Sequence, residues 1–383
     1  MNRETILTSG FGGRVLTNAN VWSADGQWIV FDTRSDPAGS VFDGTAIRAV
    51  HVGSGEVRTL YESRNGACCG VATCHPTEMK VACILGPEFP TAEWSYGPSR
   101  RQGIVIDFDG GVSNLDARDL VPPFTAGALS GGSHVHVWHP KGDWVSFTYE
   151  DEVAKDGQRN IGIAFPNHPV TVPKTHPRNH DGGYFSKLVT RTTANPRLDS
   201  DEISRACEEA WIGTTCRLAF QGTVHTSNGP MVEVFLVELL RRGFVQHRLT
   251  RTTLRKYPGI QGPRHWLRSS PDGSKIGYFM RDDRGVAQFW TMNPAEREPQ
   301  QVTDSPAPMA SAFTWHPDGR RVACIADGSV SLIDTLAGTV TPLTAKREEP
   351  PRPEACVFSP DGKRIAFVRT IAGSNQICCV GVE

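Results

Sequence analysis

One short pattern returns seven times along the chain and constrains its fold more than any other feature. Each copy is an apolar strand, a tight turn and a second apolar strand, as in Phe358-Ser359-Pro360-Asp361-Gly362 followed by Ile365-Ala366-Phe367-Val368. Proline presets the backbone of such a turn, aspartate can bond its own backbone, and glycine accepts a positive φ. The copies begin at Val21, Cys74, Trp138, Trp211, Ser269, Trp315 and Phe358. Strands joined in this way, at this spacing, predict one propeller blade per copy.

The two ends of the chain predict how the blades close. A third strand follows each copy, and a fourth ends in a threonine-marked run such as Gln300-Gln301-Val302-Thr303. The seventh copy stops after its third strand, whereas Thr5-Ile6-Leu7-Thr8 has the form of the missing fourth. We therefore predict an all-β, seven-bladed β-propeller with four-stranded blades, in which the N-terminal strand closes the last blade and removes the exposed edges.

Two insertions interrupt an otherwise continuous single domain over residues 1–383. The first spans 85–103 and the second spans 151–207. We expect the second to contain an extra strand at Tyr184–Val189 and a short helix from Asp201, since Asp199 and Glu202 have the spacing of a helix-capping pair. Long insertions on a rigid scaffold are where binding groups tend to lie.

Composition excludes several classes of protein. Lys and Arg (40) nearly balance Asp and Glu (41), so nothing in the charge favours a nucleic-acid partner. No apolar run approaches the roughly 20 residues that a membrane-spanning helix needs. The N-terminus lacks a hydrophobic signal core, so we expect a cytoplasmic protein whose ten cysteines are reduced.

A polar column is the first candidate site. Innermost strands of a propeller enter beside the central axis, so residues at equivalent positions should form a ring at one mouth of the channel. Six residues before the turn proline, or its equivalent, lie Asn18, Gly70, His134, Glu208, His265, Ser311 and Glu354. Strand alternation should point His136 the same way as His134.

We interpret this column as a divalent metal site. His134, His136 and His265 would be ligands, with Glu208 or Glu354 as a carboxylate ligand or base. Glu209 would replace Glu208 if the register of the fourth copy is displaced. Imidazole with carboxylate suits zinc, manganese or iron. The alternative is that these polar side chains line a water-filled channel and bond one another and ordered water.

Aromatic and basic residues in the insertions are the second candidate site. The first insertion contains Trp94, Tyr96, Arg100 and Arg101. Flat apolar faces beside guanidinium groups suit an acidic sugar, and equally suit an outer packing cluster. Asn18 and Glu354 of the ring are further candidates for substrate contact.

The second insertion offers candidate catalytic groups. It places Arg178 and His180 within a polar run, where they could supply a base or an anion clamp. An ordinary polar loop is the alternative.

The Ser-Pro-Asp-Gly turns and Leu-Thr strands resemble those of TolB-type propellers. A closer resemblance, to the bacterial cytoplasmic YidR-like proteins, lies in Leu16–Trp22, Gly131–Pro140, Ala206–Trp211 and Pro263–Trp266. That family is distantly similar to oligogalacturonate lyases, in which three histidines and a glutamine hold manganese and an arginine is thought to act as base.

This resemblance implies roles for particular residues of the chain. His134, His136 and His265 would take the histidine roles, and Glu208 would stand in for the glutamine. The arginine candidates for the base are Arg264, Arg178 and Arg100.

Two functions follow. The first is a metal-dependent lyase, with manganese favoured, that acts on uronic-acid-containing oligosaccharides or another acidic small molecule. The second is a non-catalytic TolB-like propeller that binds a protein or peptide partner through its rim.

Overall fold

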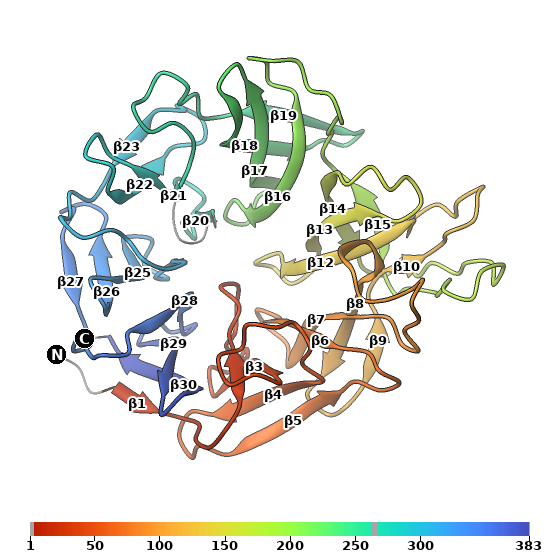
Figure 1. Ribbon diagram of the computed structural model, residues 1–383, viewed down its shortest axis with the longest axis horizontal. Helices are drawn as coiled ribbons and strands as arrows, with labels where there is room; N and C mark the ends of the chain where they lie inside the picture. Colours follow the sequence, from red (N-terminus) through yellow and green to blue (C-terminus); the bar gives the residue numbers. More distant parts are fainter. Residues whose placement is uncertain (1–3, 262–266, 383) are drawn as a thin grey trace. The chain divides into compact units, whose positions relative to one another are not determined.

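The computed structural model describes residues 4–261 and 267–382 (Figure 1). They form two compact units, an N-terminal unit of residues 12–190 and a C-terminal unit of residues 191–383 together with 1–11. Apart from one short 3-10 helix, η1 (Pro98–Arg100), every regular element of the described residues is a β-strand. The all-β prediction is therefore confirmed.

The N-terminal unit contains three successive four-stranded antiparallel ladders. Their orders are β2-β3-β4-β5, β6-β7-β8-β9 and β12-β13-β14-β15, and a short parallel pair, β10-β11, precedes the third. The bounds are β2 (Gly13–Val15), β3 (Trp28–Arg34), β4 (Ala46–His51), β5 (Val57–Glu62), β6 (Cys69–Cys74), β7 (Lys80–Leu85), β8 (Gln102–Asp107), β9 (Val112–Asn114), β10 (Ala117–Arg118), β11 (Ala128–Leu129), β12 (Gly131–Trp138), β13 (Val145–Asp151), β14 (Arg159–Phe165) and β15 (Phe185–Leu188).

The C-terminal unit contains four such ladders. Their orders are β16-β17-β18-β19, β20-β21-β22-β23, β24-β25-β26-β27 and β28-β29-β30-β1. The bounds are β16 (Ile203–Trp211), β17 (Arg217–Thr226), β18 (Gly229–Leu239), β19 (Phe244–Arg248), β20 (Arg268–Ser269), β21 (Ile276–Arg281), β22 (Ala287–Met292), β23 (Pro299–Gln301), β24 (Thr314–Trp315), β25 (Arg321–Ala326), β26 (Ser329–Asp334), β27 (Val340–Pro342), β28 (Pro351–Phe358), β29 (Arg364–Ile371), β30 (Ser374–Gly381) and β1 (Glu4–Ile6).

Apolar layers between successive ladders form the core of each unit. In the N-terminal unit, Val30 of β3 belongs to the same buried cluster as Val81 and Ile104 of β7 and β8. In the C-terminal unit, Phe279 of β21 and Trp315 of β24 likewise share one cluster. Strand alternation explains this arrangement, because the same short sequence pattern gives every central strand an apolar face on each side.

The predicted turns adopt the expected geometry. At Ser270-Pro271-Asp272-Gly273, the Gly273 amide donates to the Ser270 carbonyl at 2.9 Å, and Gly273 has φ +74°. The Ser270 hydroxyl donates to the Asp272 carboxylate at 2.6 Å. Ser359-Pro360-Asp361-Gly362 repeats these contacts, with a 2.6 Å bond from the Ser359 hydroxyl to Asp361.

The N-terminal strand completes the last ladder, as predicted. β1 pairs antiparallel with β30 and lies beside it in Figure 1; one of its pairs joins Thr5 and Cys379. A buried ion pair fixes this strand, because Arg369 of β29 donates through Nε and Nη2 to the Glu4 carboxylate at 2.9 and 3.0 Å.

Two predictions for the second insertion need correction. The helix from Asp201 does not form: Glu202 binds the backbone and side chain of Arg197, and β16 begins at Ile203. The expected extra strand is β15, which is the fourth strand of its ladder because it pairs with β14. Since β14 also lies inside residues 151–207, the true insertion is shorter than predicted. The number of blades and the single domain stay predictions.

Candidate functional site

Strand β12, which contains two of the predicted metal ligands, is bent by a β-bulge. Its ladder with β13 runs to the pair His134–Thr148 and resumes at Val137–Ser146. Between them Val135 has φ +56°. A β-branched residue rarely adopts positive φ, and such bulges re-aim the side chains around them.

The same bulge occurs in β16 and changes the predicted register there. Trp211 pairs with Leu218 as Trp138 pairs with Val145, which puts Gly213 rather than Thr214 at the turn-proline position. The positive φ of β16 falls at Glu208, with φ +54°. Glu208 therefore corresponds to Val135 and Glu209 to His136, a displacement of one residue from the prediction.

His136 belongs to a buried chain of hydrogen bonds. Its Nε2 lies 2.9 Å from the Ser133 hydroxyl, which donates to Asp116 Oδ1 at 3.0 Å. The amide of Gly103 also donates to this oxygen, at 2.6 Å. Burial lowers the pKa of His136 to about 3. The imidazole is therefore neutral at pH 7 and uses Nε2 within the protein interior.

The described residues do not converge on a metal site. No group of three or more His, Cys, Asp or Glu side chains among them could hold an ion. His134 and His136 belong to the N-terminal unit and Glu208 to the C-terminal unit, while Arg264 and His265 lie outside the described residues. The metal ligand set stays a prediction.

The N-terminal unit contains a cavity of about 480 Å³ that brings residues of both insertions together. Trp94 enters it from the first insertion, and Arg178 and His180 from the second. The lining residues are Tyr61, Leu85, Pro87, Glu88, Phe89, Trp94, Gln102, Ile104, Val112, Asn114, Arg118, Pro177, Arg178, Asn179 and His180. We take this cavity as the candidate functional site.

Three guanidinium groups surround the indole of Trp94. Arg100, Arg178 and Arg118 lie 4.9, 5.5 and 6.0 Å from its ring centroid. The indole Nε1 is buried without a hydrogen-bond partner among the described residues. Trp94 therefore combines a flat face with an unused donor at the centre of a cationic surface.

Fixed contacts hold two of these arginines. Arg178 links the insertions, because its guanidinium donates to the carbonyls of Glu88 and Phe89 at 2.5 and 2.8 Å. Arg100 forms a bidentate ion pair with Glu152, in which Nε and Nη2 each donate to one carboxylate oxygen at 3.2 Å.

Gly132 of β12 allows the segment containing Arg100 to pack directly against that strand. A Cβ atom there would lie 2.2 Å from the Pro98 carbonyl oxygen and 2.8 Å from the Arg101 amide nitrogen. Only glycine allows η1 this close approach.

Arg118 is a buried, charged cavity residue that the sequence analysis did not identify. It is 2% exposed, and it donates to the Gly131 carbonyl at 3.3 Å and to the Arg101 carbonyl. Burial raises the pKa of Asp116, and the positive charge of Arg118 opposes that rise. Burial also lowers the pKa of Arg118, and the negative charge of Asp116 opposes that fall. The alternation Leu115-Asp116-Ala117-Arg118 is the one signal that could have suggested a buried charge pair.

His180 presents a neutral imidazole to the cavity. Its backbone bridges to that of Arg118, with N–O distances of 2.9 and 3.2 Å. Burial, followed by the charge of Arg118, lowers the pKa of His180 to about 3. Its Nε2 is buried without a hydrogen-bond partner among the described residues. The ring can therefore accept a hydrogen bond or a proton from a bound molecule.

This pKa predicts loss of stability in acid. The unfolded histidine titrates near pH 6.5, so between about pH 6.5 and 3 the unfolded chain binds more protons and the free energy of unfolding falls as the pH falls. From pH 7 to pH 5 we expect His180 to account for about 2 kcal/mol of this loss. Urea unfolding at pH 7 and pH 5 measures this loss of unfolding free energy. The loss should be smaller in His180→Gln than in the wild type. It should equal that of the wild type in His168→Gln, which alters an exposed residue. Equal pH dependence in all three proteins would contradict the prediction.

The remaining predicted site residues lie outside the cavity. Tyr96 and Arg101 form a separate cluster with Phe42. Asn18 is fully buried in the N-terminal unit. Glu354, in the C-terminal unit, pairs with Arg352 at 2.8 Å.

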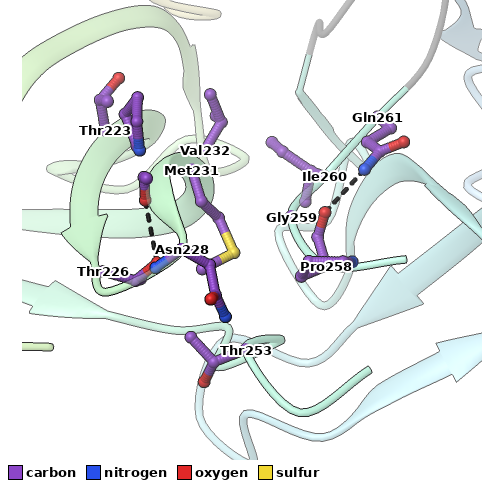
Figure 2. A pocket seen from close by; sticks show the side chains of 12 residues that line it. Thr223, Thr226, Asn228, Met231, Val232, Thr253, Pro258, Gly259, Ile260 and Gln261 are labelled. Carbon is purple, nitrogen blue, oxygen red and sulfur yellow. Dashed lines mark hydrogen bonds between the residues drawn. The ribbon is translucent and has the colours of Figure 1, made fainter. Parts of the chain in front are cut away.

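The C-terminal unit has a cavity of its own, of about 430 Å³, between the β17–β18 hairpin and the loop at Pro258–Gln261 (Figure 2). Its lining is uncharged and includes Met231 and Ile260. The Gln261 side chain donates to the Pro258 carbonyl at 2.6 Å. This C-terminal cavity contains none of the predicted site residues. The cavity around Trp94 in the N-terminal unit, which we call the cationic cavity, therefore remains the stronger candidate.

Comparisons with known proteins identify relatives of the whole chain. A family described as "Protein of unknown function (DUF3748)" matches residues 68–180, a range that includes most of the cationic cavity. The chain is 41% identical to "Uncharacterized protein YidR" of Escherichia coli (strain K12) over 92% of each protein. Within the described residues no helix has the length and apolar character to cross a membrane.

Solved structures show the fold. An oligogalacturonate lyase in complex with manganese has a TM-score of 0.69 at 12% identity, covering 100% of this chain and 93% of that one. The β-propeller domain of the Trilobed protease from Pyrococcus furiosus has a TM-score of 0.56 at 10% identity, covering 98% and 97%. The chain therefore shares the fold of these propeller proteins.

Proposed function

The chain belongs to the family of the Escherichia coli protein YidR, and we propose that it is a lyase-like enzyme that acts on uronic-acid-containing oligosaccharides. The observation that carries this proposal is the cationic cavity around Trp94, in which Arg118 and Arg178 accompany a neutral His180. The fold shared with an oligogalacturonate lyase supports it.

The cavity suits a carboxylate attached to a sugar. Its lining has two guanidinium groups, of Arg118 and Arg178, and one carboxylate, of Glu88, so it favours an anion. Guanidinium groups match the planar geometry of a carboxylate. The indole face of Trp94 can cover the apolar face of a sugar ring.

The same groups can promote β-elimination. An arginine paired with the substrate carboxylate would lower the pKa of the hydrogen on the adjacent carbon. Nε2 of His180 would accept that proton, a carbon–carbon double bond would form, and the bond from the β-carbon to the glycosidic oxygen would break. The released oxygen would take a proton from water. A carboxylate bound beside Arg118 would also raise the pKa of His180, because it offsets the nearby positive charge.

Manganese binding stays a prediction for this protein. The solved lyase is described as a complex with manganese, whereas the residues described in either unit do not form a group of ligands. The proton transfer to His180 needs only residues of the N-terminal unit.

The test is to incubate the protein with saturated oligogalacturonides, with and without manganese, and to follow the ultraviolet absorbance of the new double bond. We expect turnover, and we expect Arg178→Met to raise KM by about 10- to 100-fold with a smaller change in kcat, because it removes a charge-assisted contact of about 1.5–3 kcal/mol.

The matched control is Arg58→Met, which removes an arginine whose side chain is 60% exposed and paired with Glu56. It should behave as wild type. Absence of turnover across a panel of uronides, with manganese present, would count against the lyase. Tight binding of a peptide by a protein without turnover would support the non-catalytic alternative.

A further inference from the structure

A second group of aromatic and basic side chains includes residues of the segment that supplies Trp94. The rings of Phe42 and Tyr96 stack with centroids 4.9 Å apart and an interplanar angle of 15°. The Arg34 guanidinium lies over Phe42 at 4.3 Å, and that of Arg101 lies over Tyr96 at 5.1 Å. Four planar groups from distant parts of the N-terminal unit therefore form one cluster.

This cluster has hydrogen-bond donors that the protein does not use. Nη1 of Arg34 and Nε of Arg101 are buried without a hydrogen-bond partner among the described residues, and the buried Tyr96 hydroxyl interacts with the Arg101 side chain beside them. The side chain of Arg34 is only 6% exposed. Burial raises the pKa of Tyr96 to about 12, so its hydroxyl keeps its proton at pH 7. Buried donors left unmet are costly, and their convergence indicates a missing acceptor.

The charges of the cluster favour an anion as that acceptor. Asp32 pairs with Nη2 of Arg34 at 2.5 Å, whereas Arg101 forms no ion pair within the described part of the chain. The nearby carboxylate of Asp43 is bound by the amide and hydroxyl of Ser35. Burial raises the pKa of the neighbouring Cys68 thiol, which therefore adds no negative charge at pH 7.

We propose that Arg34, Arg101 and Tyr96 form a second carboxylate subsite, so that the preferred substrate has at least two uronic acid units. This inference rests on the proposed function. One rigid segment contributes to both subsites, since Trp94 lines the cavity while Tyr96 and Arg101 belong to the cluster.

The segment holds the two subsites at a fixed separation. Glu152 anchors it through Ser99 and Arg100, and Arg118 of the cavity donates to the Arg101 carbonyl. Trp94 and Tyr96 are two residues apart, a separation of about 7 Å at most along the chain. Such a spacing suits neighbouring units of a short acidic chain.

Calorimetric titration with galacturonic acid and with digalacturonate tests this inference. Arg101→Met should weaken the binding of digalacturonate by about tenfold or more while it changes the binding of the monosaccharide less than about threefold. Tyr96→Phe, which keeps the stacked ring, should show the same selective loss at smaller size. Arg178→Met should weaken both ligands together.

The outcomes separate the two proposals. If the wild-type protein binds neither uronide, the proposed function fails and the second subsite fails with it. If the wild type binds both, and Arg101→Met leaves both affinities unchanged or lowers them equally, the second subsite alone is overturned. Unfolding midpoints of the variants, compared with wild type, establish that any loss is local.

Discussion

Arg369→Met should lower the free energy of unfolding by roughly 3–5 kcal/mol, since breaking a buried ion pair leaves one charge uncompensated. Arg369 is 1% exposed and its partner Glu4 is 4% exposed. The variant loses both hydrogen bonds from the guanidinium to Glu4 and a third, at 2.6 Å, to the Glu349 carbonyl. It thereby loosens β1, the strand that completes the last ladder. Chemical denaturation monitored by tryptophan fluorescence measures the effect.

Arg347→Met is the matched control for this prediction. Arg347 also approaches Glu4, at 3.6 Å, but its side chain is 48% exposed. Exposed ion pairs contribute at most about 1 kcal/mol, so this variant should unfold close to wild type. The double variant Glu4→Gln with Arg369→Met should recover part of the loss, because it removes the stranded carboxylate. Equal, small effects of Arg369→Met and Arg347→Met would show that the pair does not fix β1.

Trp94→Ala should weaken binding of an acidic oligosaccharide by about 100-fold, corresponding to roughly 3 kcal/mol. The indole is the surface on which Arg100, Arg118 and Arg178 converge. Its loss removes both the face offered to a sugar ring and the support that orients the guanidinium groups. Titration with digalacturonate measures the change.

Trp94→Phe should restore much of this affinity, because it keeps a flat ring while it removes the Nε1 donor. Phe124→Ala, which removes an aromatic side chain that is 47% exposed and outside the cavity, should bind as wild type. If Trp94→Ala binds as tightly as Trp94→Phe, the aromatic face does not contact the sugar and the cavity has another use.

Local sequence was sufficient for the strands, the turns and part of the candidate site. The Ser270 turn forms as expected, because its serine, proline, aspartate and glycine each favour that geometry over four residues. The pairing of β1 with β30 followed from a missing fourth strand. The sequence indicated that Trp94 and the pair Arg178 and His180 lie in two separate long insertions, and the structure brings these residues to one cavity.

Local sequence did not predict the strand register or the contacts between distant parts of the chain. The bulge at Glu208 moves Glu209 to the position of His136, and this depends on how β16 pairs with β17. Asp116, in the bend between β9 and β10, reaches His136 through Ser133, which lies on the same strand as His136. Neither relation leaves a signal in a short window of sequence.

The sequence by itself therefore determined where the strands and turns occur, because those depend on the conformational preferences of adjacent residues. Only the tertiary structure decided that Arg118 lies beside His180, and that Arg34 and Arg101 share one aromatic stack. The physical reason is that burial and charge act through space. The pKa of His180 depends on which neighbours the packed strands place around it, wherever those neighbours occur along the chain.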